Sequence, residues 1–364
     1  NSSAASDVYK RQPFDDQEVY ENIYSSGNCF GVFQFEAPHI VRVMRETHPS
    51  SLEDLTALNA LNRPGPMQSG MVSIYIANRK EPQRVGTQSP ELEPVLAPTN
   101  GVLLYQEQVM QIAQRLAGYT LGEADVLRKA MGKKILELMR RDKERFISGA
   151  VERGVAEERA IEIWDMMAKF AGYGFNKAHS ACYAYLSYQT AYLKHYYPHH
   201  FLAALMNTYI HDSAKIAAAL KECQKLGIEV VPPSVNLSDF DFASDAQKRI
   251  VFGLGGIKHV GRAAVDEIVR VRRTGGKFES VEEFLDRVDG QKVNKTALEF
   301  MIRAGALDEF GIDRGELLRN LENYLSRRAH HNQIAMFDVE SPAARVAVST
   351  PPAEIARMEK DSIG

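Results

Sequence analysis

The sequence predicts a mainly α-helical protein with a few short β-strands, arranged as one larger helical domain followed by a smaller one. Three observations support this prediction. Apolar residues recur near the helical period over several long stretches. Runs of β-branched residues are short and sparse. A chain of 364 residues with 45% hydrophobic composition can also form more than one core.

The predicted helices have apolar periodicity and defined ends. Leu104, Val109, Ile112 and Leu116 follow the helical period, and Gly118 can close that helix. Further helices are expected over 121–134, 135–154, 177–197, 213–227 and 314–329. Their expected stops, where the sequence offers one, are Gly154, Pro198 and Gly227.

Strands are expected in two places only. The segments 227–233 and 249–255 are short and β-branched, and a polar turn region separates them. The proline-rich segment 78–100 is typical of a long surface excursion, and 339–352 of a linker.

Composition excludes several classes of protein. The formal net charge of −3 gives no global attraction to nucleic acid, so such binding must come from local charge clusters. Three separate cysteines without CxxC spacing argue against a disulfide framework and a zinc site, and they favour a cytoplasmic protein. We also expect no membrane span. Residues 1–12 are small and polar, and we interpret them as a non-native or disordered leader.

The segment 172–200 combines glycines with many groups that can contact phosphates or rings. Asn176 is a good N-cap, which predicts a helix from about Lys177 with His179 and Tyr183 on one side. A helix N-terminus beside Lys177 and His179 suits a phosphate. The alternative is that the tyrosines fill a core and the lysine is solvated.

A basic window lies between Arg128 and Arg145, where eight basic residues stand against three acidic ones. Lys133 and Lys134 follow Gly132 within it. Such a cluster can neutralise several phosphates, although a helical charge run is often only a solvated face. The GxxxxGK[ST] spacing of a P-loop is absent.

The segment 252–273 resembles a helix-hairpin-helix motif, whose tight turn directs backbone amides at a nucleic-acid phosphate. The candidate DNA contacts are Lys258, Val260, Gly261 and Arg262, together with Lys134. His259 stands where such hairpins usually have a glycine, because the turn often needs a positive φ.

Several long blocks, taken in order, resemble one family. They are "GVFQFEAPHI", "LNRPGPMQSGMV", "GVLLYQEQVMQIAQRLAGYTLGEADVLRKAMGKK", "FAGYGFNKAHSACYAYLSYQTAYLKHYYPHHFLAALMN" and "GLGGIKHVG". Together they are similar to the alpha subunit of bacterial DNA polymerase III, the C family of replicative polymerases, from about Pro13 to Gly364. The resemblance implies a fingers domain over 13–234, a helix-hairpin-helix and clamp-binding domain over 235–341, and a linker over 342–364 to an OB-type domain.

The resemblance also implies which chemistry belongs to this chain. The family's two Mg²⁺ ions are held by palm aspartates, which we expect before the first residue here. Asp15 and Asp16 are interpreted as part of a structural connector. We therefore expect no catalytic residue and no metal site in this chain, and no polymerisation by it alone.

The resemblance and the residue types together select a set for the incoming dNTP: Arg63, Arg128, Lys133, Lys177, His179, Tyr183 and Tyr188. The cations would neutralise the triphosphate. Arg63 can alternatively contact the template strand or form a loop salt bridge. Tyr183 and Tyr188 can stack on the base or exclude a ribose 2′-hydroxyl, or else pack in a helix seam.

The segment "NQIAMFD" places Gln333, Met336 and Phe337 in a pattern that resembles the family's sliding-clamp peptide. Such a segment can insert two apolar side chains into a pocket of the clamp, the beta subunit. Primer–template DNA and other holoenzyme subunits, but no membrane, are the further partners implied. The rival hypotheses are a stand-alone DNA- and clamp-binding module without a nucleotide role, and a purely structural scaffold.

Overall fold

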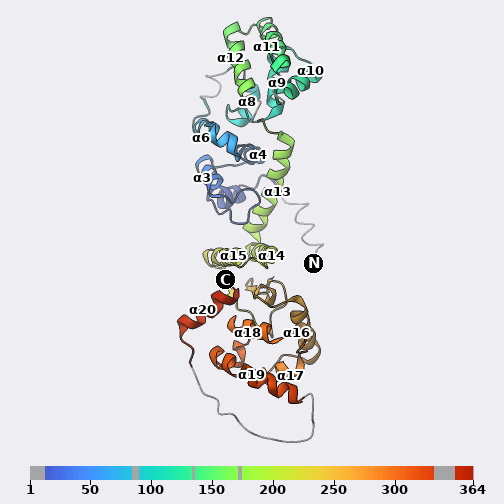
Figure 1. Ribbon diagram of the computed structural model, residues 1–364. Coiled ribbons are helices and arrows are strands. Elements are labelled where there is room, and N and C mark those ends of the chain that lie inside the picture. The colour runs from blue at the N-terminus through green and yellow to red at the C-terminus, as the bar shows by residue number, and fades with distance from the viewer. Residues whose placement is uncertain (1–12, 84–89, 133–135, 171–173, 332–348, 364) are drawn as a thin grey trace. The chain divides into compact units, whose positions relative to one another are not determined.

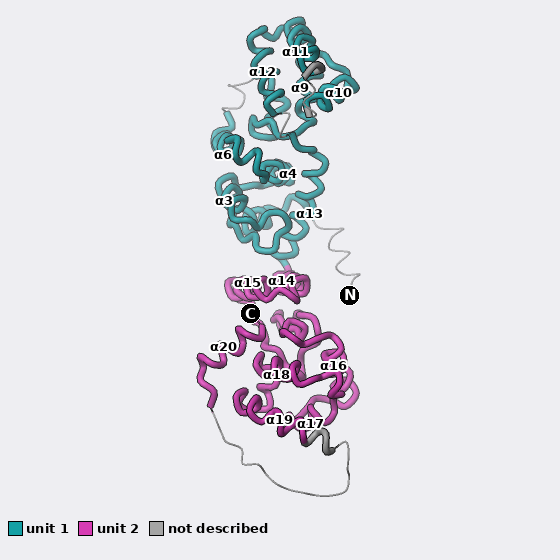
Figure 2. The backbone as a smooth tube through the Cα atoms, in the orientation of Figure 1, with its two compact units in different colours: residues 1–196 teal, residues 197–364 magenta. Residues whose placement is uncertain are grey.

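The computed structural model describes the chain except for residues 1–12, 84–89, 133–135, 171–173, 332–348 and 364. The chain divides into two compact units, residues 1–196 and 197–364. Figure 1 traces the elements, and Figure 2 colours the two units. Both units are predominantly helical, which confirms the predicted fold class. The domain boundary expected after Ser234 falls inside the second unit.

The described elements of the first unit are almost all helices. They are α2 Gln17–Val19, η1 Tyr20–Ser25, α3 Pro38–Thr47, α4 Leu52–Leu61, α5 Pro64–Gln68, α6 Met71–Lys80, α8 Glu93–Leu96, η2 Ala97–Thr99, α9 Gln106–Ala117, α10 Leu121–Gly132, α11 Leu136–Val151, α12 Glu157–Phe170 and α13 Lys177–Tyr196. Gly118 closes α9 with a positive φ of 70°, as the sequence predicts.

Helix α13 packs along α4, which is buried over most of its length. Small buried residues on α13, among them Ser180, Ala184 and Ala191, let the two backbones approach closely. The Ser180 hydroxyl donates a hydrogen bond of 2.6 Å to the Thr56 carbonyl of α4. This packing fixes the direction of α13 and hence the position of its first turn.

The described part of the first unit has two hydrophobic cores. One includes buried residues of α4 and α13. The second lies among α8 to α12 and includes the single tryptophan, Trp164. Leu92, Val95 and Leu96 belong to it and are buried. The prediction of a surface excursion over 78–100 is therefore wrong for its C-terminal part. The prolines there begin short helices that pack inward, because proline is tolerated in a first helical turn.

The described elements of the second unit are helices around a small sheet. They are α14 Pro198–Thr208, α15 Ser213–Lys225, β1 Val230–Val231, β2 Ala243–Ser244, β3 Ile250–Val251, η3 Leu254–Gly256, α16 Arg262–Gly275, α17 Val281–Arg287, α18 Lys295–Arg303, η4 Asp308–Phe310, α19 Arg314–His331 and α20 Pro352–Ile363. β3 pairs in parallel with β1 and antiparallel with β2. Strand β2 lies in the region that the sequence assigns to a turn.

The segment predicted as a linker, 342–364, contains helix α20 over 352–363. Met358 and Ser362 of this helix are buried. Arg314 of α19 holds it with a hydrogen-bonded ion pair of 3.0 Å to Glu359. The two prolines at 351 and 352 suggest a linker by composition, but proline also suits a helix start.

Candidate functional site

Residues 174–176, just before α13, form hydrogen bonds with residues 104–106 at the start of α9. The amide of Gln106 donates to the Phe175 carbonyl at 2.8 Å, and the Phe175 amide donates to the Leu104 carbonyl at 3.1 Å. The Gln106 side chain adds a hydrogen bond of 3.3 Å to the Gly174 carbonyl. Segments about 70 positions apart in the chain thus fix where α13 begins.

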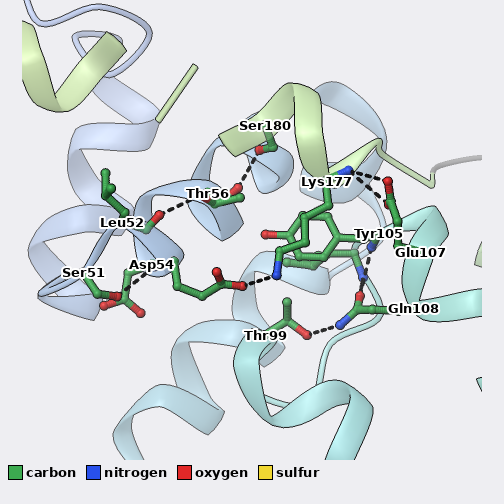
Figure 3. A network of polar contacts seen from close by, with 12 residues as sticks. Ser51, Leu52, Asp54, Thr56, Thr99, Tyr105, Glu107, Gln108, Lys177 and Ser180 are labelled. Carbon is green, nitrogen blue, oxygen red and sulfur yellow. Dashed lines mark hydrogen bonds and ion pairs between the residues drawn. The ribbon is translucent and has the colours of Figure 1, made fainter. Parts of the chain in front are cut away.

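The N-terminus of α13 is capped as the sequence predicts, because Asn176 accepts a hydrogen bond of 2.8 Å from the His179 amide. A second acceptor was not predicted. The Glu107 carboxylate of α9 accepts the Lys177 amide with both oxygens, at 3.1 and 3.0 Å, and the Asn176 side-chain amide at 3.2 Å. Figure 3 shows Glu107 beside the amide of Lys177.

The N-terminus of α13 is therefore an anion-binding site, and the Glu107 carboxylate occupies it. A helix N-terminus carries unpaired amides and the positive end of the dipole, both of which favour a negative group. The Lys177 ammonium, however, forms an ion pair of 2.7 Å with Glu53 of α4. The predicted helix that ends at Gly118 includes Glu107, but the sequence gives this residue no role. The residues around Glu107 do not indicate which distant amide donates a hydrogen bond to its carboxylate.

Two more candidate residues contact Phe175, and a third, Tyr183, contacts one of them. The Arg63 guanidinium lies 4.2 Å from the centre of the Phe175 ring. The His179 ring lies 5.4 Å from Phe175 and 4.4 Å from Tyr183. Burial lowers the pKa of Arg63 from its ordinary value, but a guanidinium stays charged at neutral pH. The structure therefore brings Arg63, Lys177, His179 and Tyr183 to one place.

Arg128 contacts residues 174–176 only indirectly, through the side chain of Gln106. It donates a hydrogen bond of 2.9 Å to the Gln106 side chain, and it pairs with Asp125 at 2.8 Å. Tyr188 does not reach it. Its ring is fully buried against Phe14 and Tyr20, which favours the alternative that Tyr188 packs in a helix seam.

Much of the basic window is neutralised by acids outside it. Lys129 pairs with Asp125, Lys143 with Asp165, and Arg145 with Glu123. Hydrogen bonds from the Thr120 backbone and from Arg145 lower the pKa of Glu123 to about 2, so this carboxylate is charged at neutral pH. The excess of positive charge counted along the basic window is therefore partly cancelled in the folded protein by acids outside the window. Lys133 and Lys134 lie outside the described residues.

In the second unit, the predicted hairpin forms between η3 and α16. His259 adopts φ 61°, the positive value that such a turn requires, and the Val260 amide donates to the Ile257 carbonyl at 3.2 Å. Gly261 is the N-cap residue before α16, and no side chain of the described residues caps this helix. The hairpin lines an open pocket of about 440 Å³, with His211 among its other lining residues.

The side chains of the hairpin differ in what they can offer a phosphate. Val260 is only 5% exposed, and its amide already donates to the Ile257 carbonyl. The Lys258 amide and ammonium donate to the carbonyls of Ser362 and Asp361 at the end of α20. Arg262 is well exposed and lies over the Phe240 ring at 3.9 Å, near Asp241.

His259 supplies a test of the hairpin conformation. A non-glycine residue at positive φ costs about 1 kcal/mol, but the His259 ring also packs on Phe300 at 4.4 Å. We expect His259→Gly to lose the ring contact and gain the backbone relief, so that stability changes little. His259→Ala keeps the strain without the contact, and we expect faster hydrogen exchange in α16 by mass spectrometry. Equal exchange in the glycine and alanine variants would contradict a strained turn.

The remaining predictions concern metals, membranes and the clamp segment. Within the described residues, no three or more His, Cys, Asp or Glu side chains are grouped so that they could hold a metal ion. No helix of the described part is both long and apolar enough to cross a bilayer. Gln333, Met336 and Phe337 lie outside the described residues.

Family models of known proteins match parts of both units. The family model for the bacterial DNA polymerase III alpha subunit finger domain matches residues 4–154, and a helix-hairpin-helix motif model matches 227–317. The chain is 44% identical over 368 residues to DNA polymerase III subunit alpha of Thermus aquaticus, covering 98% of this chain and 30% of that protein. It is 46% identical over 304 residues to the Pseudomonas aeruginosa subunit, covering 82% of this chain and 26% of that one. The chain thus spans less than a third of these relatives.

Proposed function

Because the chain belongs to the family of bacterial DNA polymerase III alpha subunits, we propose that it serves template-directed DNA synthesis and that its first unit binds the incoming dNTP. One observation carries this proposal. The start of α13 already binds an anionic group, the Glu107 carboxylate, through the Lys177 amide and the Asn176 side chain. A phosphate oxygen suits the same donors.

The surrounding side chains match the other parts of a nucleotide. Arg63 and His179 both contact the Phe175 ring next to the start of α13, where they can meet an approaching triphosphate. Arg128 holds the Gln106 side chain that binds Gly174. In this proposal the triphosphate displaces Glu107 from the amide and Glu53 from Lys177, so that fixed cations replace two carboxylates.

The second unit is proposed to hold the DNA backbone. The first amides of a helix have no carbonyl one turn before them, although the Ala264 amide of α16 donates to the Gly261 carbonyl at 3.1 Å. The space over Gly261 is open. Arg262 adds an exposed cation. Gln333, Met336 and Phe337 are proposed to bind the sliding clamp. DNA and a sliding clamp thus stand as proposed partners, together with other holoenzyme subunits.

The described residues do not form a site for the Mg²⁺ ions that phosphoryl transfer requires. The carboxylates of Glu107 and Glu53, beside the start of α13, are both bound by Lys177, one by its amide and the other by its ammonium. In the proposed function, this chain positions the phosphates and the base of the nucleotide.

Titration calorimetry with a magnesium–dNTP complex tests the nucleotide role. We expect saturable binding by the full chain and about tenfold weaker binding by Lys177→Gln, because a hydrogen bond to a charged group contributes roughly 1.5–3 kcal/mol. Lys169→Gln is the matched control, since Lys169 is an exposed lysine of the neighbouring helix α12. Its affinity should equal that of the unmodified chain.

The competing function is a DNA- and clamp-binding module without a nucleotide role. It predicts no saturable nucleotide binding and a DNA affinity that is the same with and without dNTP. That pair of results would refute the proposed dNTP site and leave the second unit as the functional part. Absence of DNA binding and of clamp binding as well would favour the structural scaffold.

A further inference from the structure

The turn over residues 31–35, between η1 and α3, holds a glutamine at a backbone angle that glutamine rarely adopts. Gln34 has a φ of 67°, in the left-handed region that favours glycine. A residue with a side chain is strained at this angle. Such strain persists only where the surrounding structure imposes it, and it occurs preferentially at functional sites.

Contacts from two helices impose this conformation. The Phe33 amide donates a hydrogen bond of 3.1 Å to the Thr190 hydroxyl of α13. The Gln34 carbonyl accepts one of 3.3 Å from the side-chain amide of Asn62, the residue that ends α4. Phe33 and Gln34 are exposed, and the residues on either side of this pair are fully buried, Val32 and Phe35. The backbone of the turn is therefore fixed, and Gln34 lies at its exposed tip.

The side chain of Gln34 is not needed to form this turn. It is exposed, and within the described part of the chain its amide group forms no hydrogen bond. A glycine would adopt the same φ without strain. The turn therefore carries a polar side chain that the local fold does not explain.

The same turn lies beside a residue proposed to bind the nucleotide. The Phe33 ring contacts the Tyr183 ring, with centroids 5.3 Å apart. Tyr183 follows the first residue of α13 by six positions, or about 9 Å along the helix axis. With the triphosphate at the start of α13, a base that contacts Tyr183 lies next to Phe33 and Gln34.

We propose that Gln34 forms a hydrogen bond with the edge of the incoming base. A glutamine amide offers two donor hydrogens and an acceptor oxygen, and the edges of all four bases present donors or acceptors. Because the backbone of the turn is fixed, only the side chain loses conformational freedom on binding. This inference rests on the proposed dNTP site and adds to it a contact with the base, which the phosphate donors at the start of α13 do not supply.

Titration calorimetry of the full chain with two magnesium-bound ligands tests this contact. The first ligand is dATP, and the second is tripolyphosphate, which has the phosphates without the sugar and the base. We expect Gln34→Leu to bind dATP about fivefold more weakly, because leucine has a similar volume but no hydrogen-bonding group. Its affinity for tripolyphosphate should equal that of the unmodified chain.

Two further variants separate a base contact from a structural role. Gln34→Gly relieves the strained angle, and this relief offsets the added freedom of the unfolded chain. Thermal unfolding followed by circular dichroism should therefore show little change, whereas dATP affinity should fall as in Gln34→Leu. If Gln34 only shaped the turn, the glycine variant would bind dATP as tightly as the unmodified chain. Gln111→Leu, at an exposed position of α9, should bind both ligands normally.

The outcomes distinguish this contact from the dNTP site itself. Unchanged dATP affinity in Gln34→Leu or Gln34→Gly would reject the base contact and leave the dNTP site in place. An equal loss of affinity for tripolyphosphate, or an equal loss in Gln111→Leu, would also reject it. Absence of dATP binding by the unmodified chain would reject the dNTP site and the base contact together.

Discussion

Replacing Met336 and Phe337 together by alanine should abolish measurable binding of this chain to a bacterial sliding clamp. In the proposed function, these two apolar side chains of "QIAMF" insert into a pocket of the clamp while Gln333 contacts its rim. Anchors of this kind each contribute on the order of 2 kcal/mol or more, so the loss of both exceeds a hundredfold in affinity. Calorimetry with the Thermus aquaticus clamp measures it, with micromolar affinity expected for the unmodified chain.

The control for this prediction lies in the same segment. Val339→Ala removes an apolar side chain two positions after Phe337 and should leave the affinity unchanged. A double variant that still binds as tightly as the unmodified chain would reject the anchor pair. Absence of binding by the unmodified chain would remove the clamp from the proposed partners, and the dNTP proposal for the first unit would stand separately.

Local sequence signals predict much of the candidate site. Asn176 caps α13, and Gly118 ends α9, because each acts on amides or carbonyls within a few positions of itself. His179 and Tyr183 lie four positions apart and do meet, with centroids 4.4 Å apart. Tyr188 falls among Ser180, Ala184 and Ala191, whose helical spacing marks the buried side of α13.

Contacts between distant segments could not be predicted from the sequence. Glu107 accepts an amide 70 positions away, and Phe33 meets Tyr183 across 150 positions. Acids outside the basic window neutralise part of it, which a count along the chain cannot reveal. The short helices within 92–99 and the helix α20 were not predicted, because proline occurs both in loops and in the first turn of a helix.

One buried side chain, Gln108, connects the second core of the first unit to the candidate site. Its carbonyl oxygen accepts the amides of Leu104 and Tyr105, both at 2.9 Å. Its amide group donates to the Val95 carbonyl at 3.1 Å and to the Thr99 hydroxyl at 2.8 Å. Figure 3 shows Gln108 between Thr99 and Tyr105.

Gln108→Ala should destabilise this core by about 3 kcal/mol, because at least two buried amides would lose their only side-chain acceptor and each orphaned group costs roughly 1–3 kcal/mol. Urea unfolding followed by Trp164 fluorescence measures the change, since the single tryptophan lies in the same core. Leu104 also accepts the Phe175 amide. We therefore expect weaker dNTP binding in this variant as well.

Gln108→Met distinguishes lost hydrogen bonds from lost volume. Methionine fills nearly the same space but is only a weak acceptor through its thioether, so most of the destabilisation should remain. Gln111→Ala, at an exposed position of the same helix, should change the free energy of unfolding by less than about 0.5 kcal/mol. If the methionine variant were as stable as the unmodified chain, packing rather than the buried amide would hold α8 and α9 together. The link from this core to Phe175 would then need another explanation.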